Sequence, residues 1–138
     1  MEDLSLHVLD IAENAIMARA SKIEIIITED HEKELQTIEI IDNGTGMDKD
    51  TLKKALDPFY STRGKKTGLG IPLFAQAAKE AGGGLEIKSA SKKGTKVIAT
   101  FKLNHIDKKP LGNMDETMRV LKAAHPEVDF TYEYIVRP

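Results

Sequence analysis

Strands that come in adjacent pairs constrain the fold of this chain more than any other feature of its sequence. Residues 23–28 and 37–41 are rich in β-branched side chains with only a charged loop between them, so they should form an antiparallel hairpin. Residues 85–89 and 96–103 form a second pair around a short turn. A regularly wound parallel sheet needs strict alternation of strand and helix, which this order lacks. The sequence therefore predicts an antiparallel or mixed sheet.

The segments around these strands have apolar residues at helical spacing, which predicts helices. In residues 3–20 apolar side chains recur at helical spacing and cover most of the circumference, which predicts a helix buried on most sides. Further helices are expected over residues 48–56, 71–81 and 114–124, and a last strand over residues 128–136. The predicted fold class is α+β: a two-layer α/β sandwich with a mixed, mostly antiparallel sheet and helices on one face.

Composition and charge narrow the class of protein. The chain has 138 residues, with 20 Lys and Arg against 22 Asp and Glu, so its formal net charge is −2. This length and 41% hydrophobic residues predict one domain with a single core. The charges do not form a basic stripe of the kind that binds a nucleic-acid backbone, so we expect no nucleic-acid partner. The lack of cysteine excludes disulfide scaffolds and thiolate metal sites. Without a recognisable signal peptide or membrane helix, we expect a soluble, cytoplasmic protein with no membrane partner.

Two polar residues on the first predicted helix are candidates for chemistry. Asp10 and Asn14 are four apart and therefore share a face of that helix. An asparagine oxygen is a hard ligand suited to Mg²⁺, and a carboxylate one turn away can take a proton or orient a hydroxyl. The alternative is a solvent-facing pair at the helix edge.

A glycine-containing segment follows the second strand. Asp42, Asn43 and Gly44 form a turn signal, but Gly46 and the lack of an immediately returning strand argue against a tight hairpin. Bare backbone at these glycines would let a flat ligand approach closely. An aspartate here can accept a hydrogen bond from an exocyclic amine, which would select adenine over guanine.

A second glycine-containing segment precedes the helix expected from residue 71. Gly68, Leu69 and Gly70 resemble phosphate-binding loops, in which backbone N–H groups and the positive end of a helix face an anion. The dinucleotide fingerprint and the Walker pattern are not satisfied. Upstream, residues 57–67 lack periodicity and predict a mobile loop, in which Arg63, Lys65 and Lys66 either close over phosphates or form a solvated basic surface.

In order and spacing, these segments resemble the GHKL superfamily of gyrase B-type topoisomerases, ninety-kilodalton heat-shock chaperones, histidine kinases and mismatch-repair ATPases. The resemblance spans about residues 4–103. Residues 9–15 are similar to the N box, 42–47 to the G1 box, 57–62 to the F box and 67–70 to the G2 box. The short lid between the last two boxes is similar to that of the histidine-kinase and anti-sigma-factor branch.

The resemblance implies the Bergerat fold, with residues 1–103 as the ATP-binding domain and residues 104–138 as a helix-strand extension of the same domain. It implies ATP and Mg²⁺ as cofactors and transfer of the γ-phosphate to a separate protein partner. An ATP-dependent conformational switch with slow hydrolysis is the alternative. The oligomeric state is left open, with a homodimer among the options.

Residue roles follow from the same resemblance. Asn14 would hold Mg²⁺, Asp10 would act as acid or base, Asp42 would bind the adenine amine and Arg63 would neutralise phosphate charge. Hydrolytic branches carry Glu at the position of Asp10 and kinases often carry Asn, so activation of water by this residue is left open. The implied catalytic residues are Asp10 and Arg63, and the implied nucleotide-binding residues are Asn14, Asp42, Gly44, Gly46, Met47, Lys66, Thr67, Gly68, Leu69, Gly70 and Thr95.

The four histidines carry no recognisable catalytic pattern. His7 lies on the first helix, where packing or a surface position is favoured over a phosphoacceptor role. His31, His105 and His125 fall in predicted loops or ends of elements without a carboxylate or nucleophile at a telling spacing, and solvent exposure is expected for them.

Overall fold

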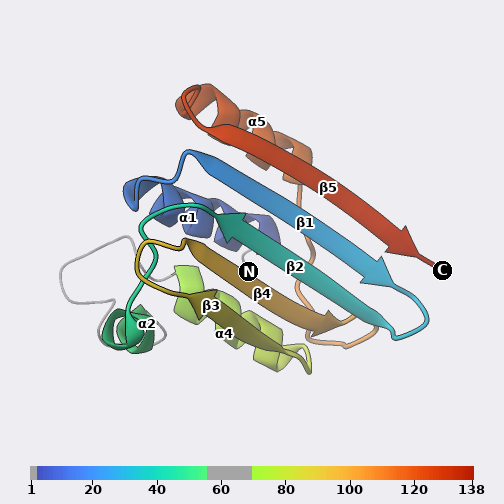
Figure 1. Ribbon diagram of the computed structural model, residues 1–138. Coiled ribbons are helices and arrows are strands. Elements are labelled where there is room, and N and C mark those ends of the chain that lie inside the picture. Colours follow the sequence, from blue (N-terminus) through green and yellow to red (C-terminus); the bar gives the residue numbers. More distant parts are fainter. Residues whose placement is uncertain (1–2, 56–69) are drawn as a thin grey trace.

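The computed structural model describes residues 3–55 and 70–138 of the chain. Helices and strands follow one another in the order expected from the sequence (Figure 1). They are α1 (Leu4–Met17), β1 (Lys22–Asp30), β2 (Leu35–Asp42), α2 (Lys49–Ala55), α4 (Gly70–Glu80), β3 (Gly84–Ser89), β4 (Thr95–Lys102), α5 (Met114–Ala124) and β5 (Asp129–Arg137).

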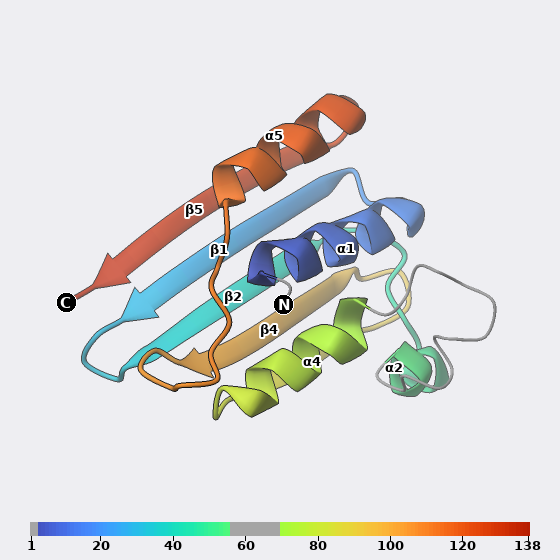
Figure 2. The ribbon, with the colours of Figure 1, turned by 180° about the vertical axis from the view of Figure 1, so that it is seen from behind.

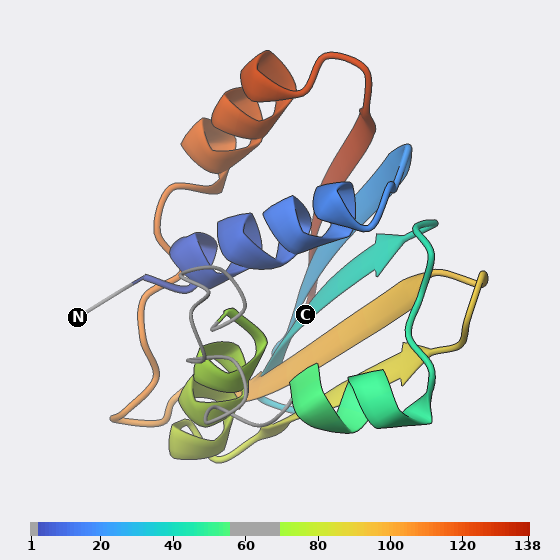
Figure 3. The ribbon, with the colours of Figure 1, turned by 90° about the vertical axis from the view of Figure 1, so that its left-hand side faces the viewer.

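The five strands form one mixed sheet in the order β3-β4-β2-β1-β5. The pairs β1–β2, β2–β4 and β3–β4 are antiparallel, and β5 adds in parallel to β1 at one edge. Helices α1, α4 and α5 lie together on one face of the sheet, as the view from behind and the side view show (Figures 2 and 3). The predicted fold class, an α+β sandwich with a mixed and mostly antiparallel sheet, is confirmed.

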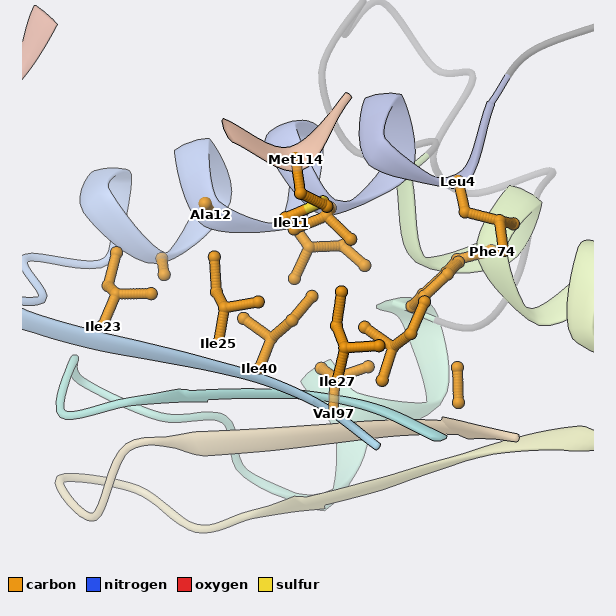
Figure 4. Close-up of a cluster of buried hydrophobic side chains, with 14 of the residues drawn as sticks. Leu4, Ile11, Ala12, Ile23, Ile25, Ile27, Ile40, Phe74, Val97 and Met114 are labelled. Atoms are coloured by element: carbon orange, nitrogen blue, oxygen red, sulfur yellow. The ribbon is translucent and has the colours of Figure 1, made fainter. Parts of the chain in front are cut away.

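The core lies between this sheet and the helix layer. On β1 the residues Ile23, Ile25 and Ile27 are completely buried and point toward the helices, while the side chains between them point to the opposite face (Figure 4). Phe74 of α4 and Phe101 of β4 are equally buried, with ring centroids 5.8 Å apart. Each such side chain contributes about 1.5–3 kcal/mol through its burial, so the alternation along the strands fixes which face receives the helices.

Helix α1 is shorter and less buried than predicted, because it ends at Met17 and exposes Leu6 and Met17. Arg19 has a positive φ of 66°, and the backbone N–H groups of Arg19 and Ala20 donate to the carbonyls of Ile16 and Ala15. This is the hydrogen-bond pattern of a Schellman motif, with arginine where glycine is usual. The motif stops the helix and turns the chain directly into β1.

The first hairpin is longer than predicted. Pairing continues through Thr28↔Thr37 and Glu29↔Gln36 to Asp30↔Leu35, so the connecting turn is shorter than the charged loop expected over residues 30–36. The prediction was wrong because the charged residues at the strand ends suggested a loop, although their side chains can remain in contact with solvent while the backbone pairs.

The C-terminal segment contributes to the same core. Met114, Met118 and Leu121 of α5 and Phe130 of β5 are buried members of the core cluster. The last strand covers one edge of the sheet, because β5 pairs with β1 along its whole length. In residues 3–55 and 70–138, no helix has both the length and the apolar character needed to cross a bilayer.

Candidate functional site

The first part of the site lies on α1. Asp10 is exposed and Asn14, one turn later on the same face, is half-buried. Helix α4 begins beside this pair, because a Cβ atom at Gly70 would lie 2.9 Å from the Cβ atom of Asp10. The structure therefore brings the start of α4 at Gly70 against Asp10 of α1. The solvent-facing alternative describes the exposure of Asp10 but not the half-buried position of Asn14.

The second part is Asp42, the last residue of β2. The backbone N–H groups of Gly44 and Thr95 donate hydrogen bonds to its carboxylate, the first of them at 2.8 Å to Oδ1. Burial raises the pKa of Asp42 above its usual range, and the two backbone donors oppose this effect. The result is a fixed, partly desolvated hydrogen-bond acceptor at the end of two neighbouring strands.

The loop after Asp42 is held by the backbone of other elements. A Cβ atom at Gly44 would lie 2.8 Å from the carbonyl oxygen of Ala18, and the N–H of Thr45 donates to that oxygen at 2.9 Å. Gly46 has a φ of +72°, and a Cβ atom there would overlap the carbonyl of Ala90. Protein packing thus explains these glycines, whereas close approach of a nucleotide to them stays a prediction.

Ser89 is a member of this site that the sequence did not reveal. Its hydroxyl accepts from the N–H of Met47 at 2.9 Å, donates to the carbonyl of Gly94 at 2.9 Å and lies 2.8 Å from Oγ1 of Thr95. The one available signal was strand register, because Ser89 faces Thr95 across the β3–β4 pair. Ser89 therefore ties Met47 and Thr95, two predicted nucleotide-binding residues, to one another.

Asn43 holds the loop after β2 through its side chain, in addition to the turn that its residue type predicted. Its Oδ1 accepts from the N–H groups of Ser21 and Lys22 at 2.9 and 3.0 Å, and its Nδ2 donates to Oγ of Ser21 at 2.9 Å. These contacts connect the loop after β2 to the start of β1. The loop is consequently attached to the C-terminal end of α1, to β1 and to β3.

A groove of about 310 Å³ opens beside Asp42, Ser89, Gly94 and Thr95. Lysine side chains border this groove. Ile41 and Lys96, which also line it, point to the helix-free face of the sheet, because their strand neighbours Ile40 and Val97 are buried on the helix side. The groove is therefore adjacent to the predicted nucleotide site but distinct from the space next to Asp10 and Asn14.

Several predicted site residues lie outside the described part of the chain. Residues 56–69 are not described, and they contain the basic loop, the F box and most of the G2 box. Among them, the residues with an expected role are Arg63, Lys66, Thr67, Gly68 and Leu69. Their roles stay predictions.

Two of the four histidines depart from expectation. His7 is buried and stacks on Phe74 with ring centroids 5.8 Å apart, in agreement with a packing role, and His31 is exposed. His105 and His125 are half-buried, so the expected exposure was wrong for both. Nε2 of His125 lies 3.1 Å from Oε1 of Glu13, a partner 112 positions away that no local spacing could indicate.

Comparison with known families agrees with this geometry. Residues 2–105 match the family described as "Histidine kinase-, DNA gyrase B-, and HSP90-like ATPase". The match includes both parts of the site, from α1 to the start of β4. The chain belongs to this family and is an ATP-binding, kinase-like domain.

Individual relatives are signalling proteins. A putative sensor protein of Shewanella frigidimarina is 33% identical over 109 residues, which are 77% of this chain and 17% of that protein. The signal transduction histidine-protein kinase AtoS of Escherichia coli is 35% identical over 103 residues, 74% of this chain and 16% of that kinase. Sporulation kinase C of Bacillus subtilis is 45% identical over 58 residues, 42% of this chain and 14% of that kinase. The chain spans less than a fifth of the length of each relative.

Proposed function

We propose that this domain binds Mg-ATP and transfers the γ-phosphate to a separate protein partner. The observation that carries the proposal is the Asp42 carboxylate, held by the N–H groups of Gly44 and Thr95 at the sheet end of a kinase-like domain. In this proposal the carboxylate accepts the exocyclic amine of adenine, and the hydroxyl of Thr95 supports it through Ser89. Met47 completes the adenine side.

The phosphate side of the proposal rests on α1. Asn14 offers an amide oxygen and Asp10 a carboxylate one turn apart, and Mg²⁺ is commonly held by one or two such groups together with substrate phosphates. In this proposal Asn14 shares the ion with the phosphates of ATP. Mg²⁺ would supply charge neutralisation at the phosphates.

Asp10 has the role of orienting or deprotonating the hydroxyl or imidazole that accepts the phosphate. Phosphoryl transfer asks a protein mainly for positioning and charge neutralisation, which Asp10, Arg63, Lys66 and the backbone of Gly68 and Gly70 would supply. The signalling relatives favour a protein in a signalling pathway as the acceptor. Dependence on ATP fits the cytoplasmic location expected from the sequence.

A labelling experiment tests this proposal. The chain is incubated with γ-labelled Mg-ATP and a lysate of its source organism, and labelled bands are tested for acid lability. We expect a labelled partner, with an acid-labile bond if the acceptor is histidine and an acid-stable bond if it is serine or threonine. ATP binding without a labelled protein would instead favour the conformational switch.

Asn14→Ala supplies the decisive variant. It should abolish Mg-dependent labelling, whereas Glu13→Gln should retain it, because Glu13 is directed to His125 at 3.1 Å and has no part in the proposed site. The two positions are adjacent on the same helix, so a general loss of α1 structure would affect both variants. Normal labelling by Asn14→Ala would refute the proposed metal role.

A further inference from the structure

Strand β5 presents a long edge of the sheet. It has nine residues, while the opposite edge strand, β3, has six. The N–H of Asp129 donates to the carbonyl of Ser21, and the carbonyl of Arg137 accepts from the N–H of His31, both at 2.9 Å. In a parallel ladder alternate residues face the same neighbour, so Phe130, Tyr132, Tyr134 and Val136 direct their backbone groups outward. Among the described residues no strand pairs with this outer edge, which thus offers four residues for pairing with another strand.

The protection of this edge against pairing is partial and comes from the charged residues Asp129, Glu133 and Arg137. Neither proline nor lysine occurs in residues 129–137. Tyr134 is 41% exposed and Val136 55% exposed, and both lie on the helix side of the sheet. There Tyr134 is in register with the buried Ile27 and Val136 with the half-buried Glu29. Long, apolar and only partly protected edge strands are sites of association with other strands.

We propose that β5 pairs antiparallel with β5 of a second copy of this chain, about a two-fold axis at Glu133. In this register Tyr132 faces the partner's Tyr134 and Phe130 faces the partner's Val136. Only outward-directed residues are joined by hydrogen bonds, as an antiparallel ladder requires. The two sheets become one continuous sheet of ten strands.

Charge complementarity selects this register and this occupant. Asp129 and Arg137 are exposed at opposite ends of β5, and the two-fold axis brings Asp129 opposite the partner's Arg137 at both ends of the interface. Between them Thr131 faces the partner's Ile135. Glu133 faces its own copy on the axis, an unfavourable pair that weakens the dimer and makes it exchangeable.

The helix layer leaves room for this pairing. Asn113 and Asp115 at the start of α5 line a groove of about 380 Å³ together with Tyr132 and Tyr134. The groove lies in the middle of β5, next to the proposed axis, where the partner's aromatic side chains would enter it. Helix α5 extends from there over the first half of β5 only and projects past its outer edge (Figures 1 and 2). By symmetry the partner's α5 would approach the uncovered second half.

Sedimentation of the full chain at increasing concentration tests the proposal. We expect a reversible monomer–dimer equilibrium. Arg137→Asp and Asp129→Arg should each raise the dimer Kd about tenfold, because two opposite-charge pairs become like-charge pairs. The double variant exchanges the charges and should restore the wild-type Kd. Glu133→Gln should lower the Kd several-fold by removing the like-charge pair.

Matched controls separate the interface from folding and from nucleotide binding. Lys88→Asp reverses a charge on the opposite edge strand and should leave the Kd unchanged. Far-UV circular dichroism should be the same in all variants, and ATP affinity should be the same in the β5 variants, because the candidate site lies on other elements than β5. A wild-type chain that stays monomeric at millimolar concentration, or a double variant no better than the single ones, overturns the proposal.

Discussion

Asp42→Asn is the most informative substitution in the candidate site. The amide has nearly the same shape but lacks the negative charge, and it retains one oxygen to accept the N–H of Gly44. A hydrogen bond to a charged group contributes about 1.5–3 kcal/mol, so losing the charge under the adenine amine should raise the Kd for ATP about tenfold to hundredfold. Discrimination between adenine and guanine nucleotides should fall with it.

The pH dependence of binding follows from the same carboxylate. Because burial raises the pKa of Asp42, the ionised form is lost at a higher pH than for an exposed aspartate. ATP affinity of the wild-type chain should therefore weaken as pH falls through this raised pKa, and affinity of Asp42→Asn should not follow that profile.

The sign of the stability effect is opposite. A folded-state pKa raised above the unfolded value means that the contribution of Asp42 to stability is present at low pH and is lost as pH rises through the folded-state pKa. At neutral pH, Asp42→Asn removes a partly desolvated negative charge, which stabilises the fold. It also places the side-chain NH₂ group against a backbone N–H that the carboxylate had accepted, which destabilises the fold. We expect these effects to oppose each other and to leave the free energy of unfolding within about 1 kcal/mol of wild type.

Isothermal titration with ATP and GTP between mildly acidic and neutral pH measures the affinity, and urea unfolding measures the stability. Glu39→Gln is the matched control, because Glu39 lies on the same strand but pairs with Lys96 on the helix-free face. An unchanged Kd for Asp42→Asn, or an equal loss in Glu39→Gln, would refute the role assigned to Asp42.

Three further substitutions test how the site and core are built, each by urea unfolding. Gly46→Ala should destabilise by more than about 2 kcal/mol, because φ is +72° and the methyl group would overlap a backbone carbonyl, whereas Gly84→Ala adds a methyl group in open space and should be tolerated. Ser89→Ala removes contacts to two backbone groups and one hydroxyl and should cost about 1–3 kcal/mol, with weaker ATP binding. Phe74→Ala should lower the free energy of unfolding by about 3–5 kcal/mol, because Phe74 is completely buried. Leu73→Ala should lower it much less, because the side chain of Leu73 is 44% exposed. Equal losses would argue against the assigned core.

Local patterns predicted the elements of this fold because each pattern depends on the burial of one face. The helix over residues 114–124 occurs with the same bounds as α5, and the strand starts and ends of the sheet are shifted by at most a few residues. Predictions from local patterns failed where contacts with residues far away in the sequence determine burial or strand pairing. His125 is half-buried because Glu13, on α1, lies beside it. The parallel pairing of β5 with β1 likewise depends on how α5 packs, which no local pattern records.

The candidate site shows the same division between local and distant information. Asp42, Gly44 and Thr95 were recognisable because their residue types and order are characteristic of a nucleotide site. Ser89 was not, since a serine at the end of a strand is common and its importance comes from the register that places it opposite Thr95. Sequence also suggested that the glycines clear space for a ligand, while the structure shows protein carbonyls on the side where a Cβ atom would point.

These attachments have a consequence for how the site would bind its ligand. The loop after β2 is joined to β1 through Asn43, to α1 through Thr45 and to β3 through Met47. All three connections are made between groups of the protein itself, so they orient the loop beside the Asp42 carboxylate and leave little ordering entropy to be lost there on binding.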